Sequence, residues 1–172
     1  MCFLKMHYYE VVQRDMILTE IVENVSVLAS PTKIILSFGG ENIEESYVLS
    51  CIFSLFFICG QKPYFIRQKV NDLSDGEVLG GKLTLRGFSM YNFLYRLLFD
   101  ILPYMKHFEG FRGPVHPNIF SFIIKDVFAF EGLGSFFLYL NLLGFLQCQV
   151  HFTTKNNIEV TMLGQSLFFC FS

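Results

Sequence analysis

The chain has 172 residues, which fits one domain with an ordinary hydrophobic core. Hydrophobic residues make up 52% and charged residues 16%, whereas a typical soluble domain has about 25% charged residues. This composition favours a membrane protein or a protein covered by partners, and the net charge of −2 argues against a broad phosphate-binding surface. The 22 phenylalanines, with no tryptophan, suggest the codon bias of an A/T-rich organelle genome.

Apolar residues at helical spacing and period-two alternation divide the chain into helices and strands. In chain order, the first half is expected to form a helix over Met6–Glu23, a strand over Lys33–Phe38, a helix over Ile43–Cys59 and a strand over Pro63–Lys69. Asn42 is expected to cap the second helix, with Glu45 completing a capping box, and Gly60 to end it.

A polar loop over Asn71–Glu77 is expected to lead into the second half. There the expected elements are a strand over Gly81–Arg86, a helix over Met90–Leu102, a loop over Glu109–Asn118, strands over Ile119–Phe130 and Gln147–Thr154, and a helix over Ile158–Phe169. Phe136–Leu146 fits either helix or strand. This order predicts a single α+β domain over residues 1–172, with an antiparallel-rich sheet that helices cover on one face.

Two apolar helical stripes are expected to pack against this sheet. Their members are Val48, Cys51, Ile52, Leu55, Phe56 and Cys59 in one helix, and Phe93, Leu94, Leu97 and Leu98 in the other.

A membrane span is not expected, because a spanning helix needs about 20 mostly apolar residues. Val48–Cys59 is too short, and Lys125, Asp126 and Glu131 interrupt the run Ile119–Leu146. The amino-terminal residues resemble neither a signal peptide nor a transit peptide. An organellar form of the chain is therefore expected to be made inside the organelle, and a small organellar membrane protein is the alternative interpretation.

Sites of catalysis and metal binding find little support. Gly76–Lys82 has the spacing of a phosphate-binding loop, but Leu83 replaces the Ser or Thr that holds magnesium, and a strand is expected where a helix should follow. The four histidines lack metal-ligand spacing, and the five cysteines are widely spaced with no CxxC pair. We expect no enzyme, cofactor or metal site; an enzyme using the Gly76–Lys82 loop is the third hypothesis.

Three segments carry a different signal. Gly60-Gln61-Lys62-Pro63 follows a helix and opens a strand. In Gly81–Gly87 the polar residues Lys82, Thr84 and Arg86 alternate onto one strand face, and Met90–Leu97 follows as a helix. Such a face can bind phosphates and ribose hydroxyls, and a solvated strand face is the plainer interpretation.

These segments, in this order, resemble the signature of the ribosomal protein L-five family. The resemblance is specific over residues 31–111, where Pro31–Gly39 resembles the family's first strand and Phe108–Phe111 its later turn. It is weak over 133–172. It implies a structural protein of the large ribosomal subunit that binds 5S rRNA and large-subunit rRNA in the central protuberance. It also implies a sheet face that meets RNA and a loop that faces the P-site tRNA and protein S thirteen of the small-subunit head.

Carried over to this sequence, the resemblance implies a set of RNA-binding residues. They are Lys33, Ser37, Gln61, Lys62, Arg67, Lys69, Lys82, Thr84 and Arg86. Ser37 stands where the family usually has Asn. Arg67–Gly80 is shorter and less basic than in the family, which argues against tRNA contact there.

Composition and the missing targeting segment predict a mitochondrially encoded member in a mitochondrial ribosome. Because the basic residues are few, we expect RNA contact around Lys33, Gln61 and Arg86 only. Neighbouring mitoribosomal proteins are expected to cover the apolar carboxyl-terminal third, where Phe136, Phe137, Tyr139 and Phe145 crowd a segment with few charges.

Overall fold

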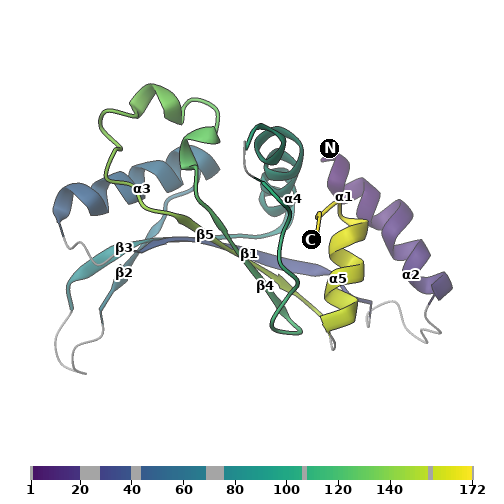
Figure 1. Cartoon of the computed structure of the whole chain (residues 1–172). Coiled ribbons are helices and arrows are strands. Elements are labelled where there is room, and N and C mark those ends of the chain that lie inside the picture. The colour runs from purple at the N-terminus through teal and green to yellow at the C-terminus, as the bar shows by residue number, and fades with distance from the viewer. Residues whose placement is uncertain are drawn as a thin grey trace. The chain divides into compact units, whose positions relative to one another are not determined.

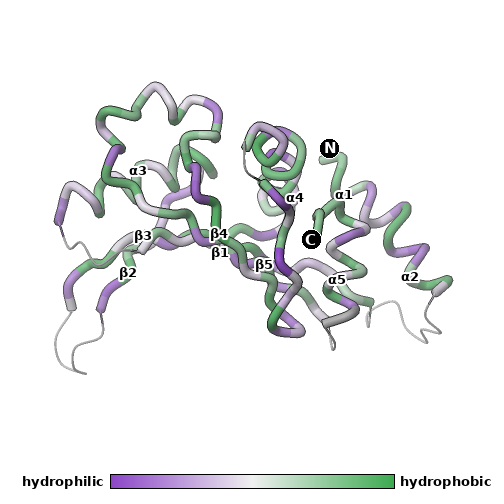
Figure 2. Tube along the Cα trace, viewed as in Figure 1, coloured by the Kyte–Doolittle hydropathy of each residue, from purple (hydrophilic) through white to green (hydrophobic). Residues whose placement is uncertain are grey.

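The computed structural model describes residues 2–19, 28–39, 44–68, 76–105, 108–154 and 157–171. The chain divides into two compact units, each assembled from separate stretches of sequence. Unit 1 comprises Met1–Ile34, Leu85–Phe122 and Gln149–Ser172, and unit 2 comprises Ile35–Thr84 and Ile123–Cys148. Hydrophobic positions recur along the strands and helices of both units (Figure 2).

The fold class is α+β, as predicted, and the strands of the described chain hydrogen-bond in the order β2-β3-β1-β5-β4. Their bounds are Pro31–Gly39 for β1, Tyr64–Arg67 for β2, Val78–Leu85 for β3, Ile119–Ile124 for β4 and Leu146–Phe152 for β5. The hairpin β2–β3 is antiparallel, and Tyr64 pairs with Lys82. All five strands were predicted from the sequence, with some shifts in their ends.

Unit 2 places helix α3, Glu45–Cys59, against the hairpin and β1 (Figure 1). A side chain at Gly81 of β3 would touch Ile52 and Leu55 of α3 at 3.0 Å, so helix and strand are in close contact there. Gly60, with φ of 67°, ends the helix in the left-handed conformation that glycine tolerates best. Short 3₁₀ turns at Val127–Ala129 and Leu133–Phe136 lie between β4 and β5.

Unit 1 joins the two ends of the described chain. Its amino-terminal helix runs through α1, Phe3–His7, a π-helical turn at Tyr8–Val12 and α2, Gln13–Thr19. The Nε2–H of His7 donates to the carbonyl oxygen of Ser166, 3.0 Å away, at the end of α5, Asn157–Ser166. The buried hydroxyl of Tyr8 donates to the carbonyl oxygen of Ala29 at 2.9 Å.

The remaining helix of unit 1 begins with α4, Gly87–Tyr95, and continues through a π-helical turn at Arg96–Ile101 and a 3₁₀ turn at Leu102–Tyr104. Its predicted inner face is confirmed, because Phe93, Leu94, Leu97 and Leu98 are all buried. Phe111 packs against Phe120 and Phe122 of β4, with ring centroids 5.5 and 4.7 Å apart.

The predicted inner face of α3 is partly wrong. Cys51 and Leu55 are buried as expected, but Phe56 is 53% exposed. Ser50 and Ser54 take buried positions instead, because each hydroxyl donates to the carbonyl oxygen four residues earlier at 2.8 Å. A serine paired in this way no longer needs water, so it can enter the packed side of a helix.

Two element boundaries also need correction, and one segment that the sequence left ambiguous is now assigned. Helix α3 begins at Glu45 with Glu44 as its N-cap, which makes no side-chain capping bond, and Asn42 lies outside the described residues. The strand predicted over Ile119–Phe130 ends at Ile124, because the Asp126 side chain accepts a hydrogen bond from the Phe128 N–H and starts a 3₁₀ turn. Phe136–Leu146, which fitted either helix or strand, forms turns and irregular structure until β5 begins at Leu146.

The described helices include none with both the length and the apolar character that a membrane crossing requires.

Candidate RNA-binding face

Strand β3 presents its polar residues on one side, as the alternation in the sequence predicts. Gly81, Leu83 and Leu85 are buried, whereas Lys82 is exposed and Thr84 is half-buried. Arg86, directly after the strand, is exposed and has extended backbone with φ of −139°. Since successive side chains of a strand point to opposite faces, Lys82 and Thr84 lie on the face turned away from α3.

Neighbouring strands of unit 2 add to this face. Tyr64 pairs with Lys82 across the hairpin, and residues directly opposite each other share a face of the sheet. Ser37 of β1 is half-buried between Leu36 and Phe38, which are fully buried on the other face. We call Ser37, Tyr64, Lys82 and Thr84 the open face of unit 2.

The other predicted residues of unit 2 lie beside the open face or outside the described chain. Gln61 and Lys62 are exposed in the short connection between α3 and β2. Arg67 is exposed at the end of β2, after a shift in register between Ile66 and Arg67. Lys69 lies outside the described residues.

Unit 1 holds the two remaining predicted residues. Lys33 of β1 is half-buried, and the next residue, Ile34, is buried on the opposite face. Arg86 stands at the N-cap of α4 and is exposed.

Sequence reasoning missed polar residues on β5. Gln147, in unit 2, is exposed and alternates with the buried Leu146 and Cys148. Gln149, in unit 1, is half-buried and continues the same alternation. The period-two alternation of Leu146–Phe152 could have indicated these outward polar residues. The resemblance to the L-five family is weak in this part of the chain, so it implied no RNA-binding residue there.

Unit 2 carries exposed charges of both signs, including Glu77 directly before β3 and Lys125 directly before Asp126. Lys82 lies on the open face, whereas the exposed carboxylates of Glu44 and Glu45 stand at the start of α3. Those of Asp126 and Glu131 belong to the turns that follow β4. Lys82 supplies positive charge to the open face, and Lys62 and Arg67 are exposed beside it, on a chain whose net charge is −2.

Catalytic chemistry finds no support in the described residues. Gly80, Gly81 and Lys82 lie within β3, so the sequence that resembles a phosphate-binding loop is part of a strand. The described part of the chain contains no group of three or more His, Cys, Asp or Glu that could hold a metal ion.

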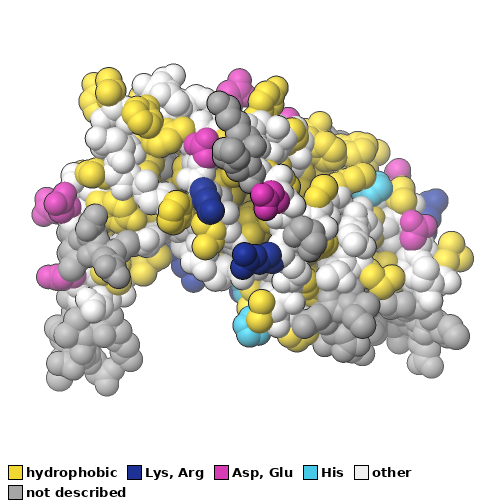
Figure 3. Space-filling view, in the orientation of Figure 1, with side chains coloured by type: hydrophobic (Ala, Val, Ile, Leu, Met, Phe, Trp, Pro, Cys, Tyr) yellow, Lys and Arg dark blue, Asp and Glu magenta, His cyan; other side chains and the backbone are white. Residues whose placement is uncertain are grey.

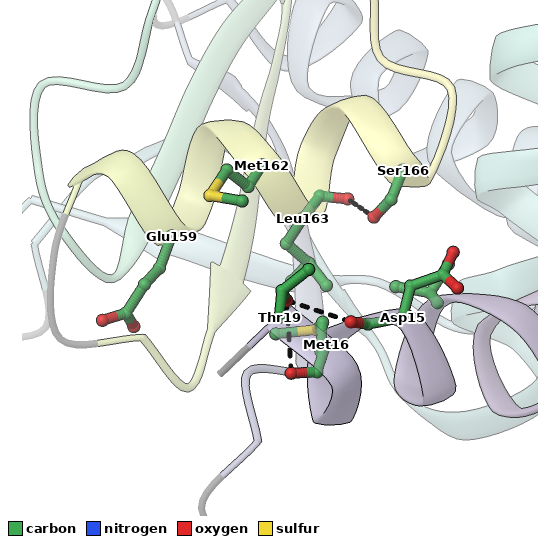
Figure 4. Close-up of a pocket in the computed structure, with 8 residues that line it drawn as sticks. Asp15, Met16, Thr19, Glu159, Met162, Leu163 and Ser166 are labelled. Atoms are coloured by element: carbon green, nitrogen blue, oxygen red, sulfur yellow. Dashed lines mark hydrogen bonds between the residues drawn. The ribbon is translucent and has the colours of Figure 1, made fainter. Parts of the chain in front are cut away.

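A pocket in unit 1 lies between α2 and α5 (Figure 4). Met16, Met162 and Leu163 contribute apolar wall. The Thr19 hydroxyl donates to the Asp15 carbonyl at 2.9 Å, and the Ser166 hydroxyl donates to the Leu163 carbonyl at 2.8 Å. Both hydroxyls are thus paired within their own helices, and neither resembles an activated nucleophile.

The buried cysteines, Cys2, Cys51 and Cys148, behave as small hydrophobic residues. Burial raises the pKa of the Cys51 thiol to about 11 and that of Cys148 well above its usual value. Both thiols remain protonated at neutral pH, whereas metal binding and nucleophilic attack require the thiolate.

Comparison with known proteins identifies the family. No family model matches the chain. The large ribosomal subunit protein uL5 of Borreliella afzelii is 33% identical over 136 residues, which cover 74% of this chain and 75% of that protein. Those of Borrelia turicatae and Mycoplasma pneumoniae are 35% identical over 121 residues and 31% identical over 113, and the chain spans 64% and 63% of their lengths. The chain therefore belongs to the uL5 family of large ribosomal subunit proteins, whose members are structural proteins and not enzymes.

Proposed function

We propose that this protein is a structural component of the large ribosomal subunit that binds rRNA through the outward residues of its strands. The observation that carries the proposal is the alternation along β3, where buried Leu83 and Leu85 separate Lys82, Thr84 and Arg86. Family membership supplies the setting, a ribosomal particle in which RNA is the main polyanion.

The chemistry of these side chains suits an RNA backbone. Lys82 and Arg86 supply positive charge for phosphates, and Arg86 can bind two phosphate oxygens at once. Thr84 and Ser37 can exchange hydrogen bonds with the ribose 2′-hydroxyl, which distinguishes RNA from DNA. Tyr64 is 77% exposed beside Lys82 and offers a ring on which an unpaired base can stack.

The RNA that we propose as ligand is 5S rRNA, together with large-subunit rRNA, in the central protuberance. The resemblance over residues 31–111 supports this assignment. Arg67–Gly80, shortened relative to the family, is the part that would approach the P-site tRNA and the small-subunit head protein S thirteen. We propose protein S thirteen as a partner, and the few basic residues of this segment argue against contact with tRNA.

We further propose that the particle is a mitochondrial ribosome. The 22 phenylalanines and the net charge of −2 support this proposal, because they fit an A/T-rich organelle genome and a ribosome rich in protein. The relatives named above are bacterial. Immunogold labelling or organelle fractionation of the source cell is the direct test, and recovery of the chain outside mitochondria would contradict the proposal.

RNA binding can be tested with Lys82→Ala and Arg86→Ala. Each variant should weaken binding to transcribed 5S rRNA and to a large-subunit rRNA fragment, and should lower the slope of log K against log salt by about 1. Lys5→Ala, which removes an exposed cation from α1, is the matched control and should leave the slope unchanged. Unchanged slopes for both strand variants would contradict the proposed face.

A further inference from the structure

The outer side of α3 is as apolar as its packed side. Leu49, Phe53 and Phe57 follow one another at helical spacing and are 70%, 40% and 41% exposed. Phe56 is exposed beside them. An isolated exposed leucine needs no explanation, but a continuous stripe of large apolar side chains marks an interaction surface.

The turns between β4 and β5 extend this stripe within unit 2. The Phe136 ring stands edge-on to Phe53 and Phe57, with centroids 5.4 and 5.8 Å apart. Phe137 packs edge-on against Phe128 at 4.9 Å. The Phe136 contacts hold the turns between β4 and β5 against α3. Further large apolar side chains of these turns remain exposed.

We call the resulting surface the aromatic face. Its exposed members are Leu49, Phe53, Phe56, Phe57, Phe137, Leu138, Tyr139, Leu142 and Phe145. Figure 3 shows hydrophobic side chains gathered over α3 and the turns above it.

The charges that accompany the aromatic face are mostly negative. Residues 44–62 and 125–148 include the acids Glu44, Glu45, Asp126 and Glu131 and, at the ends of the two segments, the exposed lysines Lys62 and Lys125. All four carboxylates belong to exposed residues. The face therefore has an apolar centre and a border whose net charge is negative.

This charge pattern selects among possible occupants. RNA would bring phosphates to a surface where acids outnumber lysines, and an anionic membrane surface would be repelled in the same way. In a dimer of this chain the same net negative border would face itself, which is unfavourable at short distance. A protein with an apolar centre and Lys or Arg at its edge would satisfy both parts of the surface.

We infer that the aromatic face docks another protein of the particle, one whose contact surface is apolar at its centre and basic at its rim. The inference rests on the proposed function, because that function supplies a particle rich in basic proteins. It assigns to the face a role separate from the RNA contacts of the open face.

Intact large subunits that contain the natural chain provide the first test. Treatment with a carbodiimide, which joins carboxylates to nearby amines, should link Glu44, Glu45, Asp126 or Glu131 to lysines of one other protein. Hydroxyl-radical oxidation of Leu138 and Tyr139 should be about tenfold slower in the particle than in the isolated chain, because the centre of a protein interface excludes water. After ribonuclease treatment this protection should persist, whereas that of Tyr64 on the open face should be lost.

Charge reversal provides the second test. Glu44→Lys combined with Glu131→Lys should lower retention of the chain in the particle about tenfold, since rim charges guide and stabilise such contacts. Glu109→Lys combined with Glu10→Lys makes the same change in net charge on exposed residues of unit 1 and should leave retention unchanged.

Four results would overturn the inference: cross-links between two copies of the chain, loss of Leu138 and Tyr139 protection with ribonuclease, free oxidation of these residues in the particle, or equal retention of the two charge-reversed variants. Absence of the chain from large subunits would overturn the proposed function, and this inference with it. Free oxidation of the aromatic face in a particle that retains the chain would overturn the inference alone.

Discussion

The open face and the aromatic face of unit 2 are built from neighbouring elements with opposite chemistry. Lys82 and Thr84 stand on a strand whose other side is buried under α3, whereas Leu49 and Phe53 stand on the side of α3 that the strands leave uncovered. The strand segregates polar from apolar residues, and the helix does not. The net charge of −2 is a sum over the whole chain, so it conceals two surfaces with different chemistry.

The largest expected effect separates the two sides of α3. Leu55→Ala should lower the free energy of unfolding by about 2–5 kcal/mol, because Leu55 is fully buried and its loss leaves a cavity. Leu49→Ala, on the outer side of the same helix, should change it by less than about 0.5 kcal/mol. Urea denaturation of both variants provides the measurement, and equal losses would remove the distinction between the two sides.

A second substitution tests how closely β3 approaches β1. The Cβ of alanine at Gly80 would collide with the backbone carbonyl of Phe38, and a backbone atom cannot turn aside. Gly80→Ala should therefore cost about 1–3 kcal/mol of unfolding free energy, the usual range for overpacking.

Gly39→Ala is the control for this substitution, because nothing lies within 4 Å of the position that its Cβ would occupy. Thermal unfolding of the two variants compares them. A Gly80 variant as stable as the Gly39 variant would mean that the strands lie farther apart than described.

The smallest expected effect concerns the open face. Thr84→Val keeps the shape of the half-buried side chain and removes its hydroxyl. If that hydroxyl bonds to RNA, affinity for the rRNA fragment should fall by about 0.5–1.5 kcal/mol, the worth of one hydrogen bond. Stability should change little, and filter binding at fixed salt measures the difference. An unchanged affinity of Thr84→Val for the rRNA fragment would mean that the Thr84 hydroxyl makes no hydrogen bond to RNA.

Helices α3 and α4 show what the sequence could predict about packing. In the helix that begins with α4 and continues through the turn at Arg96–Ile101, the polar residues Asn92 and Arg96 indicate the outer side, so Leu94 and Leu97 could be placed inside correctly. In α3 the outer side carries phenylalanines, and the only polar residues of the helix body, its serines, include two on the buried side. Periodicity cannot show which side of a helix is buried when the helix is apolar all round. Only the tertiary contacts determine which side faces the core.

The candidate site divides in a similar way. Lys82 and Thr84 followed from alternation along one strand, which needs no knowledge of neighbouring strands. Tyr64 lies beside Lys82 because of the register in which β2 and β3 pair. That register could not be predicted from the sequence of the connection between the two strands. Gln147 joins the outward residues of unit 2 from a strand far along the sequence, and no local pattern could have indicated that neighbour.

The bond between His7 and Ser166 joins residues 159 positions apart, and it has a consequence for the order of folding. The Ser30 N–H and the Thr153 hydroxyl oxygen, 2.9 Å apart, join segments almost as distant. The ribosome that makes this chain must therefore deliver the segment from Gln149 onward before unit 1 can close, although the helices of residues 3–19 are made long before it. Such long-range closure is slow, and it exposes the early apolar segments meanwhile. Unit 1 is thus expected to mature after translation of its last helix, and chaperones have a window in which to act on it.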